Sequence, residues 1–307
     1  MRAGDAQDSR ERALAGKRSL AEDVKVAITG MPRLPTLPEV ATRALTLAND
    51  ASASLKDFAA LIERDPILAT GILKLANSAL FHIGHEIASL NQAVVRLGLH
   101  ECKNLLIAVS VRSLFRGIRV NREYCESLWE HSFLTACVCL HLSRALECGH
   151  QGEEFSCGLC HDIGHILMAV AVPQLLEPAN LIDYQEAPDV LEREQEQLGT
   201  DHCSLGAWYA SGNKLPAAVV SVIQFHHSPS QATAHPLLVG LVATADQLAN
   251  HWQQNKQIDS YDVRTSAGWA TLAQHYNGER LEKVRALIPA LMAEATREAS
   301  KSSLFAA

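Results

Sequence analysis

Histidine and aspartate side chains between residues 131 and 246 have the residue types of a metal site. Imidazole and carboxylate ligands together suit zinc, iron or manganese rather than calcium. Ions held in this way could lower the pKa of a bound water and polarise a phosphoryl oxygen. A single histidine on a helix is usually an ordinary core or surface residue, so the ordered set is more informative than any one member. Its members, in chain order, are His131, His161, Asp162, His202, His226, His227 and Asp246.

These residues all fall in segments with a helical pattern of apolar residues. Side chains on one helix splay by about 100° per residue, so a single helix rarely supplies a whole metal shell. Several converging helices can, and the adjacent His161 and Asp162 could then reach two ions, or one ion from different angles. We expect the positioning helices near residues 125–147, 152–171, 188–198, 202–211, 216–226 and 236–252, and a last helix from about Glu279 in which Pro289 is a candidate for a kink.

The first half of the chain also has recognisable helix boundaries. Ser54 and Asp57 have the spacing of a capping box, and Asp65 followed by Pro66 predicts an N-cap with proline in the first turn. A further capping box at residues 89–92 opens a helix that should stop at Gly98. The sequence lacks the alternating pattern of strands with hairpin turns, so the predicted fold class is all-α.

The composition argues against several classes of protein. The 307-residue chain is long enough for one large domain or two lobes, and its 48% hydrophobic and 20% charged residues are typical of globular proteins. The net charge of −7 gives no general attraction to nucleic acid or to an anionic membrane. The N-terminus has no apolar signal region, and no apolar run approaches the roughly 18 residues of a membrane span. We therefore expect a cytoplasmic protein with neither membrane nor nucleic acid as its partner.

The eight cysteines are irregularly spaced, and several lie in apolar helical segments. Buried free thiols are the expected state. Cys157, Cys160 and His161 form a C-x-x-C-H pattern, which is the attachment pattern of c-type haem. Covalent haem attachment of this kind needs an exported chain, so the missing signal region disfavours haem. A redox pair or half of a zinc site remains open, although no second cysteine pair at useful spacing completes a zinc site.

The order of the histidines and aspartates resembles that of the HD superfamily of metal-dependent phosphohydrolases. More specifically, the chain is similar to HDOD-domain proteins, a bacterial signalling family related to HD domains. The similarity extends over roughly residues 31–230. The motifs that carry it are Leu34–Pro38, Asp65-Pro66, Leu73–Ser78, Ala93–Gly98, Trp129–Ser132, Gly158–Gly164, Gly199–His202, Leu215-Pro216 and His226-His227.

This resemblance implies an N-terminal helical lobe and a C-terminal HD-like lobe. We place an N-terminal tail at 1–21, the helical lobe at 22–118, and the HD-like lobe with the C-terminal helix at 119–300. The resemblance also implies a divalent transition metal, iron, manganese or zinc, and divides the ligands between two ions. His131, His161, Asp162 and Asp246 would be the HD-type ligands, and His202, His226 and His227 would extend the site toward a second metal.

The resemblance implies a regulatory role in bacterial signal transduction more often than catalysis. The sequence therefore favours a non-enzymatic signal-transduction module that binds a signalling protein or a small nucleotide-like ligand. The alternative is a metal-dependent phosphohydrolase acting on a nucleotide or phosphodiester. The chain departs from the cyclic-dinucleotide phosphodiesterase branch at two places. It has His165 where that branch has a lysine, and Ser228–Ser230 where that branch has Gly-Tyr-Pro. These departures argue against cyclic di-GMP hydrolysis and leave a general acid unassigned.

Overall fold

The computed structural model describes residues 37–48, 54–78, 80–81, 84–117, 122–150, 152–171 and 190–301. Helices account for the regular structure of these residues, and no strand occurs among them, which confirms the all-α prediction. The predicted tail at 1–21 and the predicted lobe boundary near residue 118 both lie outside the described residues, so the domain limits stay predictions.

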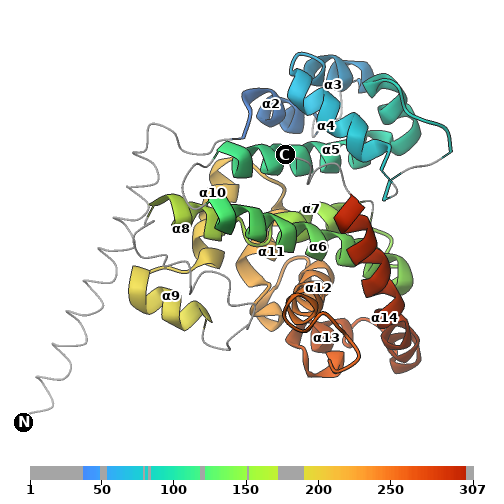
Figure 1. Ribbon diagram of the computed structural model, residues 1–307. Helices are drawn as coiled ribbons and strands as arrows, with labels where there is room; N and C mark the ends of the chain where they lie inside the picture. Colours follow the sequence, from blue (N-terminus) through green and yellow to red (C-terminus); the bar gives the residue numbers. More distant parts are fainter. Residues whose placement is uncertain are drawn as a thin grey trace, which may run out of the picture.

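In the described part of the chain, the four helices nearest the N-terminus lie at one end of the molecule (Figure 1). They are α2 (Glu39–Ala48), α3 (Leu55–Ile62), α4 (Pro66–Ala76) and α5 (Leu90–Gly117). The first three pack on α5, which in turn contacts α6 and α7 of the remaining structure. The predicted caps are present, because Ser54 and Asp57 form a complete capping box and the Asp65 side chain accepts from two backbone amides of α4. Gly98 has φ 85° and breaks α5, which then continues in a second helical stretch.

Helix α6 (Arg122–Leu146) is the central element of the rest of the fold. It packs against α7 (Glu153–Cys160), α12 (Pro236–Asn255) and α14 (Gly278–Lys301), and its residues are buried on every face over most of its length. A helix that is buried all round normally has apolar residues all round. The buried polar side chains of α6, His131 and His141 among them, therefore need partners within the core.

The remaining helices are α8 (Ile163–Ala171), α9 (Val190–Leu198), α10 (His202–Gly212), α11 (Ala217–Phe225) and α13 (Ala267–Leu272), with the 3-10 turns η1 (Pro229–Gln231) and η2 (Val263–Thr265). These helices pack mainly on one another and on α12: α8 and α9 contact α10, α10 contacts α11, α11 contacts α7 and α12, and α13 contacts α12 (Figure 1). The prediction of one helix over 152–171 is wrong, because the chain turns at His161 and Asp162 between α7 and α8. Helix α14 runs through Pro289.

Two glycines bring the turn between α7 and α8 close to its neighbours. A Cβ atom on Gly158 would lie 2.9 Å from the Cα atom of Ala136, so α7 packs directly on the backbone of α6. A Cβ atom on Gly164 would overlap the carbonyl group of His202, so α8 packs directly on the start of α10. The His161-Asp162 turn therefore lies within reach of both α6 and α10.

The buried apolar residues form one continuous cluster that extends from α2 to α14. None of the helices in the described part of the chain has both the length and the apolar character needed to cross a membrane.

Candidate metal centre

The predicted site residues come from five separate places in the chain and meet in the interior. His131 lies within α6 and Asp246 within α12. His161 and Asp162 form the turn between α7 and α8, His202 is the first residue of α10, and His226 and His227 directly follow α11. His227 is half-buried, and the other six are buried: His131, His161, Asp162, His202, His226 and Asp246.

One half of the centre is built from two imidazoles and two carboxylates. The Nε2 atom of His131 lies 2.9 Å from Asp246 Oδ1 and 3.6 Å from Asp162 Oδ2. The Nε2 atom of His161 lies 3.4 Å from Asp246 Oδ1 and 3.2 Å from Asp162 Oδ2. The two Nε2 atoms are themselves 3.3 Å apart. Two nitrogen ligands on a tetrahedral ion, each at about 2.0–2.1 Å, are separated by about 3.4 Å, so this spacing suits one shared ion.

The other half uses the second oxygen of the same aspartate. Asp162 Oδ1 lies 3.4 Å from Nε2 of His226 and 3.7 Å from Nε2 of His202. The two Nε2 atoms are 3.4 Å apart. The two carboxylate oxygens of Asp162 therefore face two different pairs of imidazoles, so this side chain could contribute one oxygen to each of two ions.

The hydrogen bonds of Nδ1, the ring nitrogen that faces away from the centre, determine which nitrogen of each imidazole could bind metal. In each ring the Nδ1 atom faces an oxygen that accepts hydrogen bonds, so Nδ1 carries the proton and a neutral ring presents the Nε2 lone pair to the centre. The oxygen partners are Gln253 Oε1 at 2.8 Å for His131, the Gly158 carbonyl at 2.6 Å for His161, Glu194 Oε2 at 2.8 Å for His202, and the Ile223 carbonyl at 3.0 Å for His226.

The electrostatics of the centre favour positive charge between the carboxylates. Burial alone would raise the pKa values of Asp162 and Asp246, but the neighbouring imidazoles outweigh it and hold both well below the usual range. Burial alone would lower the pKa of His161, but the two carboxylates raise it well above the ordinary value. For His226, burial is outweighed by Cys203 and Asp162, and the pKa is raised to about 10. A divalent cation can take the place of the protons that these imidazoles otherwise hold.

Four side chains that support or adjoin the centre were not found from the sequence. Glu194 on α9 accepts from both the ring and the backbone N–H of His202, and burial is outweighed by that imidazole so that the pKa of Glu194 falls to about 2. Gln253 holds His131 from about two turns beyond Asp246 on the same helix. His165 stacks on His202 with ring centroids 4.0 Å apart, and Cys203 lies next to His202. Two of the four had a usable signal in the sequence: Cys203 directly follows a predicted ligand, and His165 lies three residues after Asp162.

In the C-x-x-C-H segment, the two cysteines are part of the buried core and the histidine is part of the candidate metal centre. Cys157 and Cys160 are free thiols without solvent exposure, and burial raises the pKa of Cys160 to about 12. His161 is engaged through both ring nitrogens, Nδ1 by the Gly158 carbonyl and Nε2 by the aspartates. The predicted buried state of the cysteines holds for all except Cys148, which is half-buried.

The helices bring these histidines and aspartates together around the carboxylate of Asp162. The HDOD domain family matches residues 34–229, and the chain belongs to that family.

Three relatives show how far the similarity extends. An uncharacterised protein of Treponema pallidum (strain Nichols) is 29% identical over 234 residues, which is 73% of this chain and 44% of that protein; the chain thus spans less than half the length of this curated relative. The crystal structure of an HDOD domain protein of unknown function from Geobacter sulfurreducens has a TM-score of 0.67 and 20% identity, covering 92% of this chain and 98% of that one. A proposed phosphohydrolase from Shewanella amazonensis SB2B has a TM-score of 0.60 and 25% identity, covering 89% and 98%.

Proposed function

We propose that this protein is a metal-dependent phosphohydrolase of the HD type that acts in bacterial signal transduction, on a nucleotide or another phosphodiester. One observation carries the proposal: the two oxygens of Asp162 face two imidazole pairs, and every imidazole of these pairs is fixed through Nδ1 with Nε2 turned inward. A shared inward orientation of Nε2, with each Nδ1 held by an oxygen acceptor, is what ligation of metal ions by these histidines requires.

The donors divide into two subsites. The first subsite consists of His131, His161, Asp246 and the Oδ2 atom of Asp162. The second subsite consists of His202, His226 and the Oδ1 atom of Asp162, with His227 beside them. These nitrogen and oxygen donors suit iron, manganese or zinc.

Paired ions in such a centre supply a nucleophile at neutral pH and neutralise charge on a phosphoryl group. The chain's own contribution is to hold the donors in a buried position. Asp162 and Asp246 remain ionised because the imidazoles hold their pKa values low, so the centre offers two negative charges to balance the ions. Because these groups are buried, their electrostatic interactions are stronger than they would be in water. The similarity to a proposed phosphohydrolase supports the same chemistry.

The test combines metal analysis with an activity panel. Purified protein should contain manganese, iron or zinc after reconstitution, and should hydrolyse at least one member of a panel of nucleotides, cyclic dinucleotides and model phosphodiesters. The double variant His161→Ala/Asp162→Ala should lose both the metal and the activity. Metal below about one-tenth of an equivalent in the wild-type protein would contradict the proposal, since structural and catalytic sites of this kind bind tightly.

A second candidate function has the same centre without turnover. His165 and Ser228–Ser230 stand where the cyclic-dinucleotide phosphodiesterases have a lysine and Gly-Tyr-Pro, so no general acid is assigned. In this case the metal centre would bind a nucleotide-like ligand, and the module would pass the signal to a protein partner. Stoichiometric metal and saturable nucleotide binding by calorimetry, without hydrolysis over the same panel, would favour this second function.

A further inference from the structure

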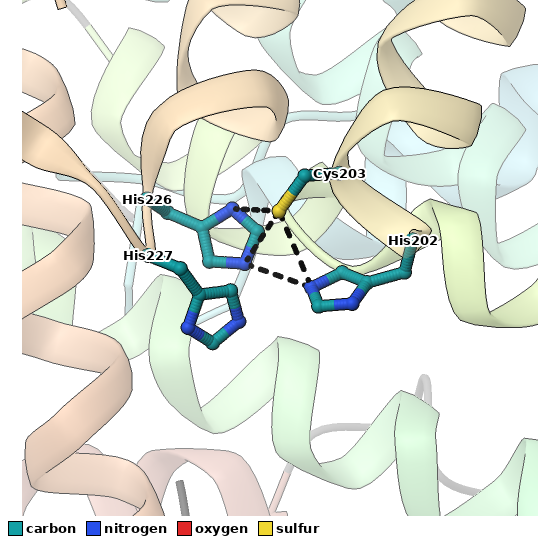
Figure 2. A group of neighbouring side chains, drawn as sticks. All are labelled: His202, Cys203, His226 and His227. Atoms are coloured by element: carbon teal, nitrogen blue, oxygen red, sulfur yellow. Dashed lines mark hydrogen bonds between the residues drawn. The ribbon is translucent and has the colours of Figure 1, made fainter. Parts of the chain in front are cut away.

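Cys203 adds a sulfur donor to the second subsite. Its Sγ atom lies 3.4 Å from Nε2 of His202, and 3.8 Å and 4.0 Å from Nδ1 and Nε2 of His226. Figure 2 shows the thiol between the two rings, with the ring of His227 completing the group. One donor atom from each of these four residues lies within 4.8 Å of every other.

These separations are close to those around a single tetrahedral ion. Bonds of about 2.0–2.1 Å to nitrogen and about 2.3 Å to sulfur place two nitrogens about 3.4 Å apart, and nitrogen and sulfur about 3.6 Å apart. The observed distances are 3.4 Å between the Nε2 atoms of His202 and His226, and 3.4–4.0 Å from Cys203 Sγ to the Nε2 atoms of the two rings. The distance from Cys203 Sγ to Nε2 of His202 is about 0.2 Å below the separation expected around one ion, and that to Nε2 of His226 is about 0.4 Å above it.

The backbone that carries Cys203 is held in place independently of any ion. Asp201 caps α10 by accepting from the backbone N–H of Ser204 at 2.7 Å. The backbone N–H of His202 donates to Glu194 Oε2 at 2.9 Å, and the carbonyl of His202 packs against Gly164. The two adjacent donors, His202 and Cys203, therefore have fixed positions at the start of the helix.

A buried cysteine is most often a small apolar residue in a core. Cys203 differs in its surroundings from the thiols of α6 and α7, since its sulfur faces imidazole nitrogens that point into the same polar centre. A purely structural thiol would not need to lie at ligand distances from two rings that are themselves fixed for metal binding.

We propose that Cys203 is a metal ligand, and that the second subsite is a thiolate–imidazole site for zinc or another thiophilic divalent ion. This inference rests on the proposed function, because it requires that the second subsite holds an ion. On binding, the thiol proton passes to solvent and the sulfur bonds to the ion as thiolate. The first subsite contains only nitrogen and oxygen donors, which suit iron, manganese or zinc. The sulfur donor would therefore make the second subsite the more selective of the two for a thiophilic ion.

Cobalt(II) titration of the metal-free protein tests the assignment, because a thiolate ligand gives a charge-transfer band in the near ultraviolet that nitrogen and oxygen ligands do not. Wild-type protein should bind two equivalents and develop this band with one of them. Cys203→Ser should keep the cobalt bound to the first subsite and lose the band. It should also weaken zinc binding at the second subsite by about 100-fold or more, since loss of an outer partner alone costs about 10- to 100-fold.

Cys148→Ser is the matched control, because Cys148 contacts Tyr276 rather than the centre and its loss should leave the band intact. Two cobalt ions bound to the wild-type protein without a thiolate band would overturn the inference while leaving the proposed function standing, and this outcome needs no variant to fold. A band that persists in a folded Cys203→Ser protein would overturn it as well. No cobalt, zinc, iron or manganese bound at either subsite would instead overturn the proposed function.

Discussion

The two subsites share one aspartate but are built in different ways. The first subsite takes His131 and Asp246 from the middle of two long, packed helices, α6 and α12. The second subsite takes its histidines from helix ends: His202 starts α10, and His226 follows α11. A residue inside a buried helix is fixed by the helix itself, whereas a residue at a helix end depends on its local partners. The first subsite should therefore tolerate changes around it better than the second.

Asp162 is the one residue whose loss should abolish this difference. Asp162→Ala removes a ligand from both subsites, and we expect both to lose affinity for metal by at least about 100-fold. Asp246→Ala removes a ligand from the first subsite only and should leave about one equivalent of metal in the second. Metal analysis after dialysis against a weak chelator distinguishes the two variants. A full equivalent retained by Asp162→Ala would contradict the bridging role of this carboxylate.

Gly164 is the point at which the second subsite depends on close packing. A methyl group there would overlap the backbone of His202, so Gly164→Ala should lower the free energy of unfolding by about 3 kcal/mol or more and displace the start of α10. Gly212→Ala, at the other end of α10, meets nothing within 4 Å and should change stability by less than about 1 kcal/mol. Urea unfolding measures both. Equal stability of the two variants would show that α8 and α10 can separate without cost.

Glu194 tests whether the second subsite relies on its outer partner. Glu194→Gln weakens the hydrogen bond that fixes Nδ1 of His202, and should weaken metal binding at the second subsite by about 10- to 100-fold while the first keeps its affinity. Glu196→Gln on the same helix is the control, because Glu196 is exposed. Competition with a chromophoric chelator gives both affinities. An equal loss at both subsites would mean that Glu194 acts on the whole centre.

Much of the fold could be predicted because its signals are local. The caps at Ser54 and Asp65 and the break at Gly98 each depend on a few neighbouring residues, and the structure has all three. The interruption at His161-Asp162 could not be read from periodicity. The residues on both sides continue an apolar helical pattern, and the turn is set by close packing of Gly158 and Gly164 on other helices.

The candidate metal centre also has a part that the sequence could predict and a part that depends on tertiary contacts. The residues that the family resemblance supplied converge as expected, because their order in the chain is a shared pattern. Glu194 and Gln253 have no such pattern, since a carboxylate on a polar helix and an amide near a helix end are common. Their roles arise only from the tertiary contacts with His202 and His131.

Metal binding should depend on pH, because the metal-free protein holds a proton on His226 that the metal-loaded protein lacks. In the metal-free protein, Cys203 and Asp162 outweigh burial and raise the pKa of His226 from 6.5 to about 10. The stabilising effect of this proton is complete below pH 6.5 and is lost as the pH rises through about 10. Metal binding requires the deprotonated ring, so the affinity should rise with pH, by up to about tenfold per unit for each proton displaced.

The difference in melting temperature between zinc-loaded and metal-free protein should accordingly widen between pH 6.5 and pH 9. His226→Ala, measured in the same way, should show a smaller change, because the second subsite loses the group that exchanges its proton for the ion. A difference that stays constant across this range in the wild-type protein would mean that His226 is already neutral without metal. The Nε2 atom of His226 would then be available to an ion without loss of a proton. The difference between ligands at helix ends and ligands within helices would not apply to their protonation.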